Sequence, residues 1–98
     1  MRTLVKVTIT VEAGNAAIKD DRLGKIMQTT METLKPEAAY FFGYHGRRSA
    51  WFVFDLKSSA DIPSIAEPFF LGFNADVEFF PVMNAEDLKA GLGKITKP

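Results

Sequence analysis

The first segment of the chain alternates apolar and polar side chains with the two-residue period of a β-strand. Its apolar positions are Val5, Val7, Ile9 and Val11, with Lys6, Thr8 and Thr10 between them. The pattern predicts a strand over residues 4–11 that has one apolar and one polar face. Gly14 and Asn15 are expected to break this strand.

A helix is expected next, because apolar side chains recur there at three- and four-residue spacing. The stripe consists of Leu23, Ile26, Met27, Thr30 and Leu34. Asn15 is the candidate N-cap of this helix, and Pro36 is expected to end it.

Residues 38–56 predict two aromatic-rich strands joined by a tight turn at residues 46–49. If the turn is centred on Arg47 and Arg48, opposite positions pair Tyr44 with Trp51, Phe42 with Val53 and Tyr40 with Asp55. Phe41 with Phe54, and Gly43 with Phe52, then lie on the other side. Both sides of the hairpin are therefore apolar, and Tyr40 and Asp55 are placed to share a cross-strand hydrogen bond.

The rest of the chain predicts a second helix, a fourth strand and a terminal helix. Ser58, Ser59 or Asp61 is the cap of the second helix, which Pro68 shortens or kinks and which finishes around residues 70–73. Its apolar positions are Ile62, Ile65, Ala66 and Phe69. The fourth strand is expected over residues 75–82. Asn84, followed by Glu86 and Asp87, starts a helix with Leu88, Leu92 and Ile95 on one stripe.

The expected order β-α-β-β-α-β is the split βαβ arrangement, a ferredoxin-like α+β fold with a four-stranded antiparallel sheet, to which this chain adds a C-terminal helix. Both helices lie on one face of such a sheet, so the other face stays bare. Because the hairpin and the last strand are apolar on both faces, we expect a second copy of the chain to cover the bare face in a twofold homodimer. The alternative is that the terminal helix folds back over it.

Composition narrows the class of protein. The 98 residues are enough for one domain, residues 1–98, and nearly half of them are apolar. Twelve acidic and twelve basic residues cancel, which disfavours nucleic acid as a partner. No cysteine is available for disulfides or thiolate zinc sites. No leader and no apolar run long enough to span a bilayer is seen, so the expected location is the cytoplasm, with no membrane partner.

Several segments resemble the dimeric α+β barrel superfamily. They are "FFGYHGRRSAWFVFDL", "PFFLGF" and "ADVEFFPVMNAEDL", which together with the intervening helices cover nearly the whole chain. Within that superfamily, "VEFFPVMNAEDL" is similar to small uncharacterised bacterial proteins of the domain-of-unknown-function type. "VKVTITV" and "SAWFVFDL" give a fainter likeness to muconolactone isomerase. The resemblance implies a dimeric barrel fold and a ligand held between the helices and the sheet.

The residues that haem degradation and a metal site would each require can be looked for in the sequence. The haem-degrading branch uses an Asn on the first strand, a Trp on the third and an axial His on the second helix. Here Trp51 is present, but Thr8 and its neighbours are not Asn and the second helix has no His. A metal site of the His-and-carboxylate type needs several convergent ligands, and the chain has one histidine. We therefore expect no metal and no cofactor.

The candidate site residues come from the hairpin and the second helix. His45 is the candidate proton-transfer residue, since imidazole titrates near neutral pH, but a histidine beside a turn is more often a surface residue. Arg47 and Arg48 are candidates to bind an anion through forked hydrogen bonds. The alternative is that both side chains are simply solvated at the tip of the hairpin. Tyr44 and Trp51 line an aromatic slot or belong to an interface. Phe69 and Phe73, in "EPFFLGFN", either line a cleft or belong to the core.

Lys6, on the polar side of the first strand, is expected to pair with Glu78 of the last strand.

Two functions follow from these alternatives. The first is a noncatalytic homodimer that binds a small apolar or aromatic molecule or acts as an interaction module. The second is a cofactor-free isomerase or monooxygenase on an aromatic or lactone substrate, with His45 as the proton-transfer group. The second requires His45 to point into a cleft, and we favour the first because a fold with many activities is poor evidence for one of them.

Overall fold

The structure, a computed structural model, describes residues 1–95. The helices and strands are β1 (Arg2–Ile9), α1 (Val11–Lys19), α2 (Arg22–Leu34), β2 (Ala38–Tyr44), β3 (Arg47–Asp55), a 3-10 turn at Ser59–Asp61, α3 (Ile62–Phe73), β4 (Asp76–Pro81) and α4 (Ala85–Leu92). They form an α+β domain with one four-stranded antiparallel sheet, which is compatible with a ferredoxin-like fold.

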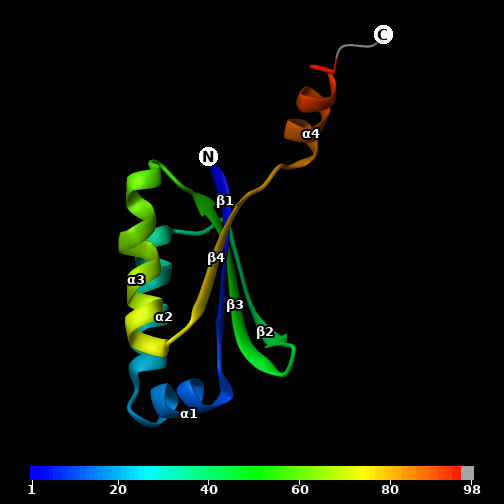
Figure 1. The fold of residues 1–98 in the computed structure, drawn as a ribbon. Coiled ribbons are helices and arrows are strands. Elements are labelled where there is room, and N and C mark those ends of the chain that lie inside the picture. The colour runs from blue at the N-terminus through cyan, green and yellow to red at the C-terminus, as the bar shows by residue number, and fades with distance from the viewer. Residues whose placement is uncertain (96–98) are drawn as a thin grey trace.

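The sheet has the strand order β2-β3-β1-β4, so β2 and β4 are its edges. Helices α1, α2 and α3 lie on one face of it, as Figure 1 shows. Along β1, every second residue from Thr3 to Ile9 is buried beneath these helices, which is the two-residue period that the sequence predicts. The opposite side, here called the open face, has no helix over it.

The core lies between the helices and the covered face of the sheet. Its largest fully buried side chains are Val5, Val7, Phe52, Phe69 and Phe73. The Phe69 ring stacks on Phe52 of β3 with 6.5 Å between centroids and contacts Phe73 at 6.3 Å. Helix α3 is thus held to the centre of the sheet by aromatic packing, which adds to the free energy of burial.

The first helical region differs from the prediction in where it starts. β1 ends at Ile9, and Val11 begins α1 instead of continuing the strand. Thr10 is the N-cap, because its side-chain oxygen accepts a hydrogen bond from the Ala13 N–H at 3.2 Å. Gly14 and Asn15 lie inside α1, so the prediction that they break the chain there is wrong.

The real break lies between α1 and α2. Asp21 adopts a left-handed conformation with φ 63°, and the Asp20 carboxylate accepts a hydrogen bond from the Arg22 N–H at 3.1 Å. The Arg22 guanidinium also donates to the Gly72 carbonyl at the end of α3. A second helix can therefore start at Arg22 in a new direction, and it ends at Leu34, before Pro36 as predicted.

The hairpin turn lies two residues earlier than predicted. His45 and Gly46 form a two-residue loop with φ 53° and 76°, the positive values that a type I′ turn requires at both positions. Tyr40 therefore pairs with Trp51, Phe42 with Ser49 and Tyr44 with Arg47. The predicted pairs Tyr40 with Asp55, Phe42 with Val53 and Tyr44 with Trp51 are wrong. The predicted faces are nevertheless correct, because partners move by an even number of residues and side chains alternate with period two.

The second half of the chain agrees with the sequence more closely. Ser58 caps the 3-10 turn that leads into α3, Pro68 lies within α3, and the helix ends at Phe73. Asn84 starts α4 in a capping box with Asp87. α4 ends at Leu92, so Ile95 follows the helix, and β4 spans Asp76–Pro81. Within residues 1–95 no helix is long and apolar enough to cross a membrane.

Helix α4 stands away from the rest of the chain, beyond the end of the sheet (Figure 1). It therefore does not cover the open face, which was the alternative to a homodimer.

The turn geometry gives a first test. Gly46→Ala should lower the free energy of unfolding by about 1 kcal/mol, because alanine is strained at a φ of 76°. His45→Asn should leave the stability unchanged or raise it slightly, since asparagine is preferred at this turn position. Urea unfolding measures both effects. A neutral Gly46→Ala would contradict the register and favour a turn centred on the two arginines.

Candidate functional site

An apolar cleft of about 590 Å³ lies beside the hairpin. Its walls come from β1, the start of α1, α2, and both strands of the hairpin. The residues that line it are Val7, Ile9, Val11, Leu23, Met27, Phe41, Phe42, Gly43, Gly46, Arg47, Arg48, Ser49 and Ala50. A cleft of this size, with mostly apolar walls and few polar groups, is typical of sites for small molecules.

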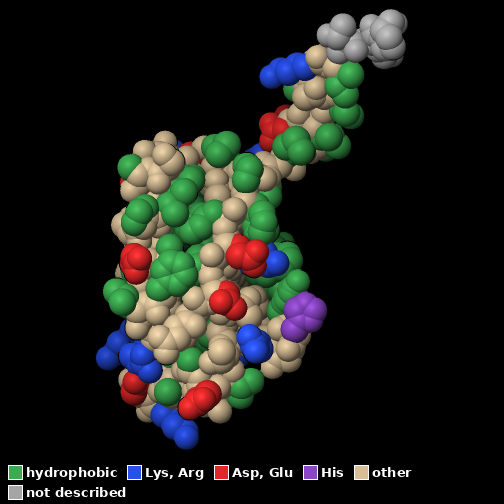
Figure 2. Space-filling view, viewed as in Figure 1, with side chains coloured by type: hydrophobic (Ala, Val, Ile, Leu, Met, Phe, Trp, Pro, Cys, Tyr) green, Lys and Arg blue, Asp and Glu red, His purple; other side chains and the backbone are tan. Residues whose placement is uncertain are grey.

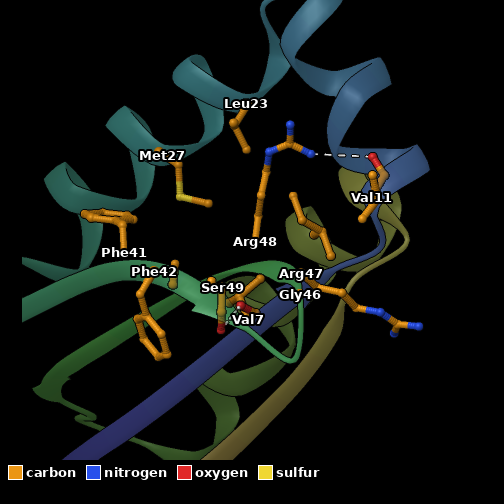
Figure 3. A pocket seen from close by; sticks show the side chains of 13 residues that line it. Val7, Val11, Leu23, Met27, Phe41, Phe42, Gly46, Arg47, Arg48 and Ser49 are labelled. Atoms are coloured by element: carbon orange, nitrogen blue, oxygen red, sulfur yellow. Dashed lines mark hydrogen bonds between the residues drawn. The ribbon is translucent and has the colours of Figure 1, made fainter.

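The cleft exists because the helices do not reach across the whole sheet. The edge strand β2 extends beyond the covered region, and Phe41, which points to the helix side, is 58% exposed. In Figure 3 its ring lies near Met27 of α2. Gly43 lies two residues further on the same face, and a Cβ built there would meet no heavy atom within 4 Å. A strand glycine often marks a place where a ligand or another backbone approaches closely.

Arg48 supplies a charged group whose side chain crosses the cleft. It lies on the helix face of β3, opposite Gly43 and Ile9, so its side chain crosses the cleft towards α1 (Figure 3). Its Nη2 donates to Asn15 Oδ1 at 3.0 Å, and its Nη1 lies 3.5 Å from the Val11 carbonyl oxygen. Both acceptors are uncharged. The five ion pairs found within residues 1–95 do not include Arg48.

Gly14 leaves room for the Arg48 side chain. A Cβ at Gly14 would lie 2.5 Å from Arg48 Nη1 and 3.2 Å from both Arg48 Cδ and Ile9 Cδ1. The absence of a side chain at this position in α1 therefore lets the guanidinium lie against the helix. Gly14 and Arg48 act together, although they are 34 residues apart and no local sequence pattern connects them.

The open face of the sheet is a second apolar surface, separate from the cleft. Its side chains are those of Leu4, Lys6, Thr8, Ala38, Tyr40, Phe42, Tyr44, Trp51, Val53, Glu78 and Phe80. At its centre the Lys6 ammonium lies 4.8 Å from the ring centroids of both Tyr44 and Trp51 and 5.8 Å from that of Phe80. Lys6 is thus held by cation–π contacts.

The predicted ion pair of Lys6 with Glu78 is absent from residues 1–95, although the two residues are direct cross-strand partners. The aromatic rings around Lys6 hold its ammonium instead. Asp55, expected beside Tyr40, contacts Lys57 Nζ at 2.5 Å and the Met1 ammonium at 2.6 Å. These two cations lower the pKa of the Asp55 carboxyl to about 2.

The predicted site residues fall in three different places. His45 is exposed in the turn, 4.3 Å from the Tyr44 ring, and its imidazole is the purple side chain on the outside of the molecule in Figure 2. It does not line the cleft. Arg47 lines the rim, but its side chain extends away from Arg48 (Figure 3). Phe69 and Phe73 are 1% exposed in the core.

Tyr44 and Trp51 lie on the open face, 6.1 Å apart. Phe42 contacts Trp51 edge to face at 5.1 Å. The Trp51 indole N–H is buried and has no hydrogen-bond acceptor within residues 1–95. A buried indole N–H usually finds a partner, so this donor is a polar group that burial within the chain leaves unsatisfied.

Comparison of the sequence with protein-family models and with curated proteins finds no match. The resemblance to the dimeric α+β barrel superfamily gains no support from relatives, and the architecture is compatible with a ferredoxin-like fold. A function must therefore be argued from the cleft and the open face.

The close approach of Gly14 to Arg48 gives a test with a matched control. Gly24 lies in α2, and a Cβ there would meet no heavy atom within 4 Å. Gly24→Ala should raise the free energy of unfolding by up to about 1 kcal/mol, as is usual for a helix. Gly14→Ala should raise the free energy of unfolding by less than Gly24→Ala does, or should lower it, because the Arg48 side chain must move to make room for the added Cβ. Equal gains in urea unfolding would contradict the contact between Gly14 and Arg48.

Proposed function

We propose that the chain is a noncatalytic, homodimeric binding domain whose cleft beside the hairpin takes a small apolar or aromatic molecule that carries an anionic group. The observation that carries this proposal is the cleft itself, in which apolar walls surround the guanidinium of Arg48. The homodimer is proposed to form through the open face of the sheet.

The walls of the cleft support an apolar or aromatic body for the ligand. Leu23, Met27 and Phe41 offer flexible or aromatic surface, and Gly43 leaves space between them and the hairpin. Methionine adapts its shape to irregular ligands and contacts aromatic rings favourably. Burial of a ligand against such walls is favourable in proportion to the apolar area removed from water.

Arg48 supports an anionic group on that ligand. A guanidinium has five N–H donors, and Arg48 has contacts to two neutral oxygens. Its remaining donors have no carboxylate among the ion pairs of residues 1–95. Arginine binds carboxylates and similar anions through two parallel hydrogen bonds, which gives direction as well as strength.

The position of His45 is the reason that no catalytic role is proposed. The side chain lies outside the cleft, and the left-handed turn gives a structural reason for its place. None of the residues that line the cleft is of a type that titrates near neutral pH.

The exposed surface of the chain supports a homodimer. A folded monomer of 10.9 kDa is expected to expose about 5,600 Å². This chain exposes 6797 Å². The excess is about 1,200 Å², part of which comes from the extended α4, and it is larger than the surface of about 800 Å² that each partner buries in a standard interface. The open face offers a continuous aromatic area for such an interface, which includes Tyr40, Phe42 and Trp51.

Fluorescent probes test the cleft. 8-Anilinonaphthalene-1-sulfonate is an aromatic anion, and N-phenyl-1-naphthylamine has a similar ring system without the sulfonate. The protein should bind the sulfonate more tightly, and Arg48→Met should remove this preference, a loss of about tenfold or more in affinity. Arg47→Met is the control, because the Arg47 side chain extends away, and it should have little effect.

A second variant separates the cleft from other apolar surfaces. Gly43→Leu should fill the cleft and weaken both probes, while Gly24→Leu on the exposed side of α2 should not. If Gly43→Leu binds both probes as the wild type does, the probes lie elsewhere and the cleft is not the site.

Two matched substitutions test the homodimer. Tyr40, on the open face, is 63% exposed in a single chain, and Leu71, on α3, is 80% exposed. Sedimentation equilibrium should give twice the chain mass for the wild type and for Leu71→Glu, but a single chain for Tyr40→Glu, since a charge in the interface is costly to desolvate. A dimeric Tyr40→Glu protein would exclude the open face as the interface.

A further inference from the structure

We infer that α4, with the residues around it, is an arm that docks on the second copy of the chain through an apolar stripe. The arm is defined as residues 82–95, and the stripe consists of Leu88, Leu92 and Ile95. This inference rests on the proposed homodimer and goes beyond it, because it assigns an interface role to a segment outside the sheet.

The stripe is exposed in a single chain. Leu88 is 47% exposed, Leu92 57% and Ile95 63%; Leu88 and Leu92 lie one turn apart in α4, and Ile95 follows three residues later, past the end of the helix. Met83, at the start of the arm, is 67% exposed. Figure 2 shows hydrophobic side chains along this segment, away from the body of the molecule. An apolar stripe of this kind normally faces a packing partner.

Helix α4 is too short to be stable on its own. It has eight residues, and isolated helices shorter than about 12–15 residues are marginal in water. The capping box of Asn84 and Asp87 helps to start the helix, but it does not bury the stripe. A partner surface is therefore the missing source of its stability.

The body of the same chain does not provide this surface. Val82 still pairs with β1, through its N–H and the Arg2 carbonyl oxygen at 3.2 Å, so the arm leaves in the direction of β4. Arg2 Nη1 then holds Asp87 at 3.2 Å, at the first turn of α4. Between the arm and the end of the sheet lies a hollow of about 740 Å³, lined partly by charged residues that include Arg2, Glu37 and Asp87.

The shape of the chain points to a second copy as the occupant. The radius of gyration is 15.9 Å, against about 12.6 Å for a compact domain of this length. The extended arm accounts for part of the excess surface described above. In a twofold dimer the arm of each copy docks on the other copy. Because the net charge of the chain is zero, two copies do not repel each other strongly.

Two matched substitutions in the full chain test the role of the stripe. Leu92→Asp places a charge on the stripe, and Ala90→Asp places the same charge on the opposite side of α4. The dissociation constant of the dimer is measured by sedimentation equilibrium. Leu92→Asp should raise it by about tenfold or more, because the substitution acts twice in a twofold dimer. Ala90→Asp should leave it nearly unchanged.

Each other outcome overturns the inference in a recognisable way. If both variants dimerise as the wild type does, the dimer stands without the arm. If both weaken it equally, helix formation matters but the stripe does not dock. If Leu92→Asp tightens the dimer, the arm covers its own chain. A wild-type protein that stays a single chain at all concentrations would overturn both the arm and the proposed homodimer.

Discussion

The structure depends on the fact that one sheet carries apolar side chains on both faces while its helices cover only one. Helices α1, α2 and α3 bury Val5, Phe52 and their neighbours, and this burial holds the fold together. No helix among residues 1–95 covers the open face, which carries Tyr44, Trp51 and Phe80. The free energy of covering that face is therefore available to a binding partner.

The cleft also exists because the helices do not cover the whole of one face of the sheet. The helical layer does not extend over the edge strand β2, so Phe41 and Gly43 border open space. The break between α1 and α2 allows α1 to lie beside the hairpin end, where Arg48 reaches it. One polar group in an apolar cleft is an arrangement that binds and orients a ligand, and His45 lies outside it.

Much of the fold could be predicted from alternation and helical spacing alone. The strands, α3, α4 and the faces of the hairpin follow from side-chain periodicity, which an even shift in register does not change. The start of α1 was missed because Val11 continues the alternation of β1, although Thr10 is a good N-cap residue. The turn was misplaced because two arginines look solvated, whereas His45-Gly46 fits the two-residue loop better.

The candidate site was less predictable, because it depends on distant contacts. Arg48 shares the alternation of Ala50, Phe52 and Phe54, which would have placed it on the helix face once the turn was known. Its meeting with Gly14 and Asn15 depends on how α1 packs, and no local pattern encodes that. Phe69 and Phe73 belong to the core because α3 lies over the centre of the sheet and not beside the cleft.

The central claim is that another copy of the chain covers the open face in solution. Trp51 is the single tryptophan and lies on that face, so its fluorescence reports directly on whether a second copy covers the open face. The account predicts emission at short wavelength and weak quenching by acrylamide in concentrated protein, with a red shift and stronger quenching on dilution. Emission and quenching that stay constant across the dilution, in a protein with the mass of one chain, would contradict it.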